Sequence, residues 1–138
     1  MIKKIAIHIW EFPQHLLAFI LLKVFKISHK EKYKTATVYY IDSKFMFGAS
    51  LGEYILIHKD WSNMKKTIKH EYGHTLQSYM FGPLYLLIIG LPSVIQNILS
   101  SIFYKLGKPE MHRNYYKRYP ESWADKLGGV DREDTYFG

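Results

Sequence analysis

Residues 68–83, IKHEYGHTLQSYMFGP, contain the motif H-E-x-x-H at His70, Glu71 and His74. Residues four apart share one face of an α-helix, so both imidazoles can converge on one ion. Glu71, one residue further round, can reach a water molecule on that ion but is poorly placed to bind the ion beside both histidines. The spacing predicts a helix that carries two metal ligands and a carboxylate able to act as general base.

Signals for the start and the end of a helix surround this motif. Ser62 or Asn63 is suited to cap the N-terminus, and Gly82 with a following proline predicts that the helix ends at Phe81. Gly73 costs a helix about 1 kcal/mol relative to alanine, which indicates close packing of a backbone or a substrate beside the histidines. A second set of residues gathers on the opposite side of the helix and predicts its core stripe: Met64, Ile68, Tyr72, Thr75, Leu76 and Tyr79.

A catalytic zinc site usually has three protein ligands and a water molecule, so a third ligand is needed. The chain has no cysteine, which excludes thiolate ligands and disulfides. The remaining common third ligand is a glutamate on a second helix, for which Glu110, Glu121 and Glu133 are candidates. We favour Glu121 because it begins a short predicted helix, PESWADKL, in which Asp125 follows one turn later on the same face. Asp125 can then orient a ligand histidine. Alternatively, the two acidic residues only complement the helix dipole.

A simpler interpretation of the motif has no metal. The two histidines would lie on the surface, and Glu71 would pair with a neighbouring lysine. The amphipathic pattern and the downstream carboxylates favour the metal site instead. The lysines available to that surface ion pair are Lys65, Lys66 and Lys69.

HEYGH followed by ESWAD resembles the two metal motifs of the gluzincin metallopeptidases, the thermolysin-like clan, whose second motif is E-x-x-x-D. The segments GASLGEYILI, GPLYLLIIGLPS and YPESWADKLGG are also similar to a group of small bacterial proteins of zincin type. Gln77 and Met80 stand where a metzincin would need glycine and histidine, which excludes that class. The resemblance implies a minimal zincin-like α+β fold with a small sheet, an active-site helix and a glutamate helix, here with extra apolar helices.

The resemblance also implies a role for each site residue. His70, His74 and Glu121 would bind Zn²⁺, Glu71 would be the catalytic base, and Asp125 would contact a ligand histidine. A zinc-dependent peptidase with these residues would cleave a peptide or protein substrate that pairs with an edge strand between residues 35 and 59. No residue is assigned to the oxyanion, for which the candidates are His112, Tyr115, Tyr116 and Tyr119.

The composition is that of a globular protein. With 48% hydrophobic and 17% aromatic residues, the 138-residue chain is not disordered, and we expect one domain over residues 1–138. TATVYYIDS and EYILIHKD are predicted strands, and Gly48 and Gly52 between them suit a bend or bulge. We expect this to be the only strand-rich region, and a polar tail from Gly129 onward.

The charge is positive, with a formal net value of +7. It is compatible with nucleic acid, an anionic membrane surface or simple solubility. Only three of the nineteen basic residues are arginine, the residue that reads DNA sequence best, and the lysines are scattered. We therefore expect no nucleic-acid partner.

Two apolar segments raise the question of a membrane. Polar residues interrupt the N-terminal segment, which has no signal-peptide cleavage pattern, and we expect Pro13 to open a helix that runs to about Phe25. Residues 83–103 hold no charge over a length typical of a membrane span, and Gly90 and Pro92 are expected to split them into two helices.

A single crossing by residues 83–103 conflicts with the predicted metal site. It would place the ligands on either side of about 30 Å of hydrocarbon, whereas zinc bonds are about 2 Å long. We expect buried core helices first, and peripheral membrane contact second, in a protein that is cytoplasmic or membrane-associated. The leading function is a zinc-dependent peptidase. The alternative is a noncatalytic binding or membrane-associated module of the same fold.

Overall fold

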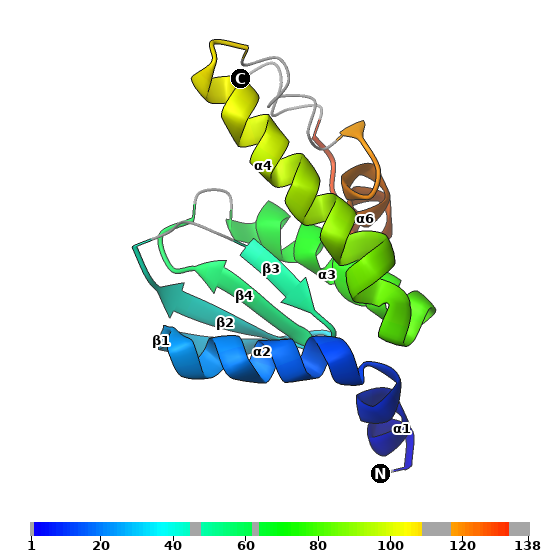
Figure 1. The fold of residues 1–138 in the computed structure, drawn as a ribbon. Helices are drawn as coiled ribbons and strands as arrows, with labels where there is room; N and C mark the ends of the chain where they lie inside the picture. The colour runs from blue at the N-terminus through cyan, green and yellow to red at the C-terminus, as the bar shows by residue number, and fades with distance from the viewer. Residues whose placement is uncertain (1, 45–47, 62–63, 109–116, 133–138) are drawn as a thin grey trace.

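The computed structural model describes residues 2–44, 48–61, 64–108 and 117–132, and confirms the α+β fold class. Its centre is a mixed four-stranded sheet in the order β1-β2-β4-β3 (Figure 1). Strands β1 and β2 are antiparallel, β2 and β4 are parallel, and β4 and β3 are antiparallel. The strands are β1 (Lys26–Tyr33), β2 (Ala36–Asp42), β3 (Gly48–Leu51) and β4 (Tyr54–His58).

Helix α3 (Met64–Phe81) carries the H-E-x-x-H motif and packs on the sheet. Its Ile68 and Tyr72 join the main apolar core with side chains of β2 and β4, so the predicted core stripe is correct in its centre. The helix ends at Phe81 as predicted, and Gly82 follows with φ of +53°, a conformation that suits glycine. The expected N-terminal caps, Ser62 and Asn63, lie outside the described residues.

Helices α1 (Ile2–Trp10) and α2 (Phe12–Val24) are bent by 85° relative to each other. Helix α2 follows the prediction closely, with Pro13 in its first turn. Ala18 is fully buried, and His15 makes an edge-to-face contact with Tyr54 of β4 at a centroid distance of 5.1 Å. The buried Gln14 amide donates hydrogen bonds of 2.8 Å to the Ser78 hydroxyl and the Gly82 carbonyl, which tie α2 to the end of α3.

The apolar segment after α3 is a single helical stretch, and the expected split at Gly90 and Pro92 is wrong. A 3-10 turn, η1 (Gly82–Leu84), leads to a π-helical turn, η2 (Leu86–Gly90), which continues directly into α4 (Leu91–Lys105). Gly90 has helical φ and ψ of −61° and −50°. Pro92 has no N–H, and the Ile88 carbonyl one turn earlier accepts a hydrogen bond of 2.7 Å from the Tyr119 hydroxyl instead.

The expectation that this stretch is buried core is also wrong. The 20-residue helix Leu86–Lys105 has a mean hydropathy of 1.8 over its most apolar window, yet only 11% of that window is buried. By length and composition it can cross a membrane. Of the fifteen residues of α4, ten are exposed, among them Val94 at 55% and Ile98 at 54%, and Ser100 is the one that is buried.

Strand β1 was not predicted. Its sequence, KISHKEKY, alternates weakly, and every residue except the last is exposed, because β1 is an edge strand with no helix packed over most of it. A strand without a buried face leaves no apolar period in the sequence. The expected bend falls at Gly52, which has φ of +67°, whereas Gly48 begins β3.

The last described helix, α6 (Glu121–Gly128), packs against α3 through glycine. A Cβ atom on Gly73 would lie 1.9 Å from the Ala124 carbonyl oxygen, and one on Gly128 would lie 1.9 Å from the Lys69 carbonyl oxygen. The close approach predicted at Gly73 is therefore that of a backbone. Helix α6 starts at Glu121, one residue after Pro120, with which the predicted segment PESWADKL begins. Gly129 follows the helix in the left-handed conformation, with φ of 73°.

Replacing Gly73 by alanine is expected to force α3 and α6 apart. We expect the variant to lower the free energy of unfolding by at least about 2 kcal/mol, since the Cβ atom meets a backbone oxygen that cannot move aside. Urea unfolding followed by circular dichroism measures the loss. Gly90→Ala is the matched control. Its Cβ has no neighbour closer than 3.5 Å, so unfolding free energy should stay equal or rise by up to about 1 kcal/mol. Equal stability of Gly73→Ala and the wild type would contradict this packing.

Candidate metal centre

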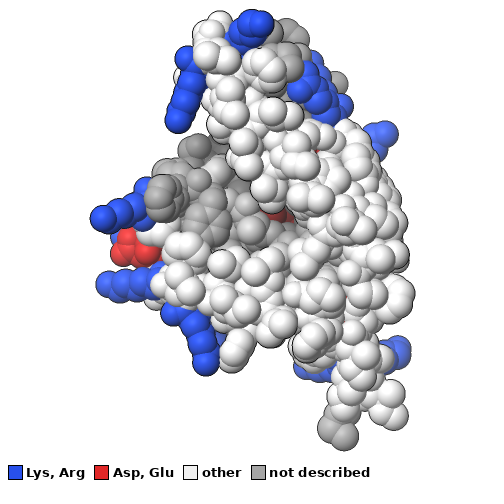
Figure 2. Space-filling view, viewed as in Figure 1, with Lys and Arg blue, Asp and Glu red and all other residues white. Residues whose placement is uncertain are grey.

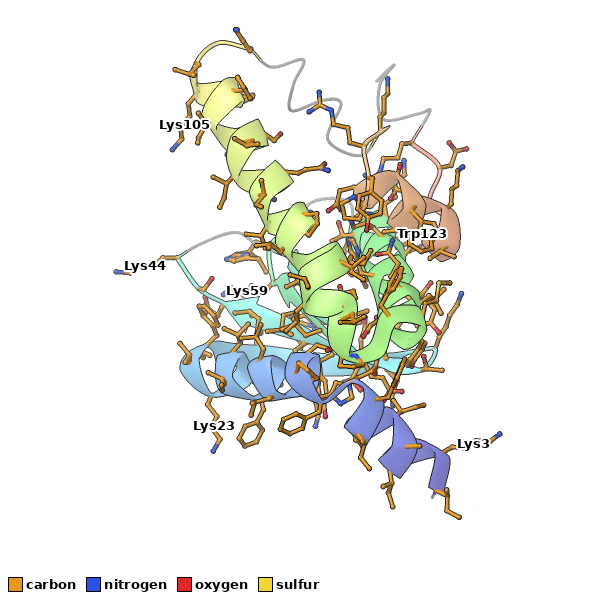
Figure 3. The ribbon with its side chains drawn as sticks, turned by 45° about the vertical axis from the view of Figure 1, so that its right-hand side comes forward. Lys3, Lys23, Lys44, Lys59, Lys105 and Trp123 are labelled. Atoms are coloured by element: carbon orange, nitrogen blue, oxygen red, sulfur yellow. The ribbon has the colours of Figure 1, made fainter. Side chains whose placement is uncertain are left out.

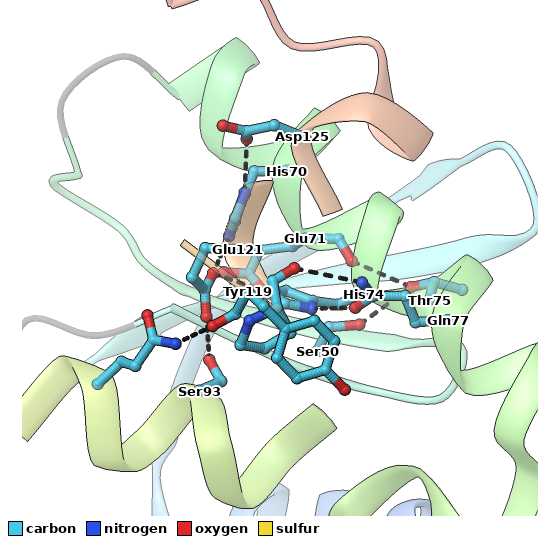
Figure 4. A network of polar contacts seen from close by, with 12 residues as sticks. Ser50, His70, Glu71, His74, Thr75, Gln77, Ser93, Tyr119, Glu121 and Asp125 are labelled. Carbon is cyan, nitrogen blue, oxygen red and sulfur yellow. Dashed lines mark hydrogen bonds and ion pairs between the residues drawn. The ribbon is translucent and has the colours of Figure 1, made fainter. Parts of the chain in front are cut away.

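Three buried side chains converge at the crossing of α3 and α6 (Figure 4). The Glu121 Oε2 atom lies 2.8 Å from Nε2 of His70 and 3.1 Å from Nε2 of His74. The two imidazole rings have their centroids 4.8 Å apart and are nearly perpendicular, at 87°. One nitrogen of each histidine and one oxygen of Glu121 thus face a common point, and the three residues can hold a metal ion.

The spacing of these atoms fits a small divalent cation. Bonds of about 2 Å in tetrahedral geometry place two ligand atoms about 3.3 Å apart. The nitrogen-to-oxygen distances of 2.8 and 3.1 Å need to open by only a few tenths of an ångström to reach that value. Three protein ligands leave the fourth tetrahedral position for water or substrate, which is the arrangement of catalytic rather than structural zinc sites.

Asp125 orients His70. Its Oδ1 atom accepts a hydrogen bond of 2.7 Å from Nδ1 of His70, which leaves Nε2 to face the centre. Arg132 donates to the same carboxylate from Nε at 2.7 Å and from Nη2 at 3.0 Å. Burial raises the pKa of Asp125. The hydrogen bonds from His70 and Arg132 lower this pKa by more than burial raises it, so the net shift is downward. Arg132 therefore belongs to the site and not to the expected polar tail.

Gln77 orients His74 in the same way. Its Oε1 atom accepts a hydrogen bond of 2.7 Å from Nδ1 of His74, and its Nε2 atom donates one of 3.3 Å to the Pro120 carbonyl. Gln77 is fully buried, although an amide in the middle of a helix is usually exposed. The sequence signal that could have revealed this role is its position three residues after His74, on the same helix face.

The electrostatics of the centre favour a carboxylate at Glu121. Burial raises the pKa of Glu121, but hydrogen bonds from His70 and His74 outweigh burial and bring the pKa well below its ordinary value. Burial lowers the pKa of His70, and its bonds to Asp125 and Glu121 outweigh that effect and raise it to about 9. The Ser93 hydroxyl of α4 donates a hydrogen bond to Oε1 of Glu121, the oxygen that does not face the histidines.

Glu71 lies beside the three ligands and is 7% exposed, which argues against a surface ion pair with lysine. Burial raises the pKa of its carboxyl group, and the nearby His74 and His70 partly offset that shift. A Cβ atom on Gly48 would lie 3.1 Å from Oε1 of Glu71, so the start of β3 approaches this carboxylate closely. A carboxylate of raised pKa binds a proton more readily than an exposed one, which suits a group that exchanges protons beside the ligands.

A pocket of about 600 Å³ opens over the centre and is lined by His70, Glu71, His74 and Glu121. Its walls come from β3, from α2 through Leu17 and Leu21, and from the start of α4, and they are mostly apolar. Figure 2 shows a hollow in the viewed face with an acidic group at its floor. Arg132 is the only lysine or arginine among the described residues that line the pocket.

The structure brings together all five residues predicted for the site: His70, Glu71, His74, Glu121 and Asp125. The other third-ligand candidates, Glu110 and Glu133, lie outside the described residues. So do three of the four oxyanion candidates, His112, Tyr115 and Tyr116, while the fourth, Tyr119, donates its hydroxyl to the Ile88 carbonyl. The sequence interpretation missed Gln77, Ser93 and Arg132.

Comparisons with known proteins do not extend this description. No protein-family model, curated protein or solved structure matches the chain. A function can therefore be proposed only from the geometry of the centre.

Removing either orienting side chain is expected to weaken metal binding. Asp125→Ala and Gln77→Ala should each lower zinc affinity about 10- to 100-fold, because the ligand histidine loses the acceptor that fixes its ring. Competition with a chromophoric chelator measures the affinity. Asp125→Asn retains an acceptor oxygen and should lose less. Asp42→Ala, which removes an exposed carboxylate of β2, should bind as the wild type does. Unchanged affinity in both alanine variants would contradict the orienting roles.

Metal binding is also expected to stabilise the fold, because the ligands come from two helices far apart in the sequence. A zinc concentration 100-fold above Kd should add about 2.7 kcal/mol to the free energy of unfolding, a rise in Tm of roughly 10 °C. Differential scanning fluorimetry with zinc or with a chelator measures the change. His74→Ala should show no zinc-dependent rise. An equal rise in that variant would place the metal elsewhere.

Proposed function

We propose that the protein is a zinc-dependent hydrolase of the gluzincin type that cleaves peptide bonds. The observation that carries the proposal is the convergence of His70 Nε2, His74 Nε2 and Glu121 Oε2 on one point, at distances of 2.8 and 3.1 Å from oxygen to nitrogen. Glu71 borders the same pocket. These residues occupy the positions of the H-E-x-x-H and E-x-x-x-D motifs.

Zinc is the proposed metal because of the donor set. Two neutral imidazoles and one carboxylate are the ligands of catalytic zinc in many hydrolases, whereas magnesium and calcium prefer oxygen donors. The hydrogen bonds that the outer ring nitrogens of the two histidines donate to Asp125 and Gln77 are typical of zinc-binding histidines. When bound, zinc polarises a substrate carbonyl and lowers the pKa of a water molecule.

Glu71 would carry the proton in this reaction. Its buried carboxylate lies beside the ligands, and burial raises its pKa, which makes it a stronger base than an exposed glutamate. It would take a proton from the attacking water and then give that proton to the leaving amine. Ser93 and the two histidines hold Glu121 in place. Glu121 would therefore serve as the metal ligand, whereas Glu71 would be the base.

The shape of the pocket supports an extended peptide as the substrate. Strand β3 is an edge of the sheet and lines the pocket with Gly48, Ala49, Ser50 and Leu51. An edge strand offers unpaired backbone groups with which an extended chain can form hydrogen bonds. The apolar walls favour a substrate with large apolar side chains next to the cleaved bond.

Glu71→Gln tests the proposal. The variant keeps the size of the side chain but cannot accept the proton, so hydrolysis of a peptide library should fall at least about 100-fold while stoichiometric zinc is retained. Mass spectrometry of the library and metal analysis of the purified protein provide the two measurements. Glu31→Gln is the matched control. It makes the same change on β1, away from the pocket, and should leave hydrolysis unchanged.

Two results would count against the proposal. A wild-type protein that neither contains nor takes up zinc would remove the metal site altogether. Zinc retention without cleavage of any peptide would instead favour a noncatalytic zincin-like module, in which the same centre serves to stabilise the fold.

A further inference from the structure

A large apolar surface covers helices α1, α2 and α4. We call it the apolar face, and on each helix it has large aliphatic or aromatic side chains that are about half exposed or more. Figure 2 shows the part of it over α2 and α4, where lysine and arginine appear at the margins and not in the middle. Representative members are Ile5 (54%), Ile9 (71%), Phe19 (58%), Ile20 (49%), Ile95 (47%) and Leu99 (48%).

This exposure exceeds what a soluble monomer usually shows. Single exposed apolar residues are common, but a surface built from three helices is typical of a binding face. The contribution of Leu86–Lys105 is the strongest, because the helix has a mean hydropathy of 1.8 and only 11% of the window is buried. An exposed apolar surface of this kind is typical of one that an apolar partner covers.

On the described parts of the three helices, the exposed charged side chains are of one sign. Lys3 and Lys23 on α1 and α2, and Lys105 at the end of α4, point outward from it (Figure 3). Lys4 also lies on α1, and Lys26 and Lys108 follow shortly after α2 and α4 in the sequence. Among the described residues of 2–26 and 86–108 the only acidic one is Glu11, which is fully buried.

We propose that the apolar face docks the protein on a lipid bilayer that carries anionic headgroups. Apolar side chains entering the acyl boundary, with lysines at the level of the headgroups, are the pattern of proteins that lie on a membrane. A second copy of this chain fits less well. A two-fold interface across the apolar face would bring these lysines toward each other, with no exposed acid on the described parts of the three helices to pair with them.

The contacts of α4 favour lying on the bilayer over crossing it. The Ser93 hydroxyl binds Glu121 and the Ile88 carbonyl binds Tyr119, so the first half of the helix is fixed against the segment that supplies the third ligand. Glu121 in turn lies within 3.1 Å of both histidines of α3. A crossing by α4 alone would carry this polar centre into hydrocarbon.

Docking in this way also orients the pocket. Leu17, Leu91, Val94 and Ile98 line the pocket and are at the same time exposed on the apolar face. The mouth of the pocket is therefore continuous with the surface that meets the lipid. The docking itself depends on none of the metal ligands, so it stands or falls separately from the proposed hydrolase activity.

Vesicle flotation with the purified full-length protein tests the proposal. The protein should float with vesicles of phosphatidylcholine and phosphatidylglycerol and much less with phosphatidylcholine alone, and high salt should weaken the binding. Lys23→Glu with Lys105→Glu should reduce partitioning by roughly 25-fold or more, since each lysine at an anionic surface contributes roughly fivefold. Ile20→Asp with Leu99→Asp should abolish flotation.

The matched control is Lys30→Glu with Lys32→Glu, which makes the same change in net charge on β1, outside the three helices. It should float nearly as the wild type does. Circular dichroism and urea unfolding establish that every variant is folded. No flotation of folded wild type with anionic vesicles would overturn the proposal. So would equal loss in both lysine pairs, or a lipid-free dimer that Ile20→Asp with Leu99→Asp dissociates.

Discussion

The close backbone contact between α3 and α6 is the constraint on which the site depends. Gly73 and Gly128 let the two helices approach until each faces a carbonyl oxygen of the other, at Ala124 and Lys69. No side chain fits between them. The first residue of α6 is Glu121, so this approach is what delivers a carboxylate to the histidines of α3, which lie about fifty residues earlier in the chain.

The polar groups at this crossing form a network in which each ligand has a supporting partner. Asp125 holds His70, Gln77 holds His74, and Ser93 holds Glu121. Burying such groups is costly unless they are paired. The support comes from three helices, and α4 contributes Ser93 although its outer surface is apolar. The helix is thus a structural part of the centre and not an appendage to the fold.

The sequence predicts the site better than its surroundings. The histidines and Glu121 could be found because ligand chemistry restricts residue type and spacing. The C-terminal end of α3 could be predicted because Gly82 follows it. Ser93 and Arg132 could not be found, since their contacts to Glu121 and Asp125 depend on tertiary position alone, whereas the spacing of Gln77 from His74 within α3 was a local signal that we missed. Strand β1 escaped prediction because it has no buried face, and the helix Leu86–Lys105 was placed in the core because hydropathy does not distinguish a buried helix from an uncovered one.

Helices α2 and α4 each have two apolar surfaces, one toward the pocket and one away from the protein. Leu21 of α2 lines the pocket, as does Leu86 in the η2 turn that leads into α4, whereas Ile20 of α2 and Ile95 of α4 are exposed. In the proposed docking, the side chains that meet the lipid and the side chains that line the pocket belong to the same helices, so the entrance to the pocket would lie at the membrane surface.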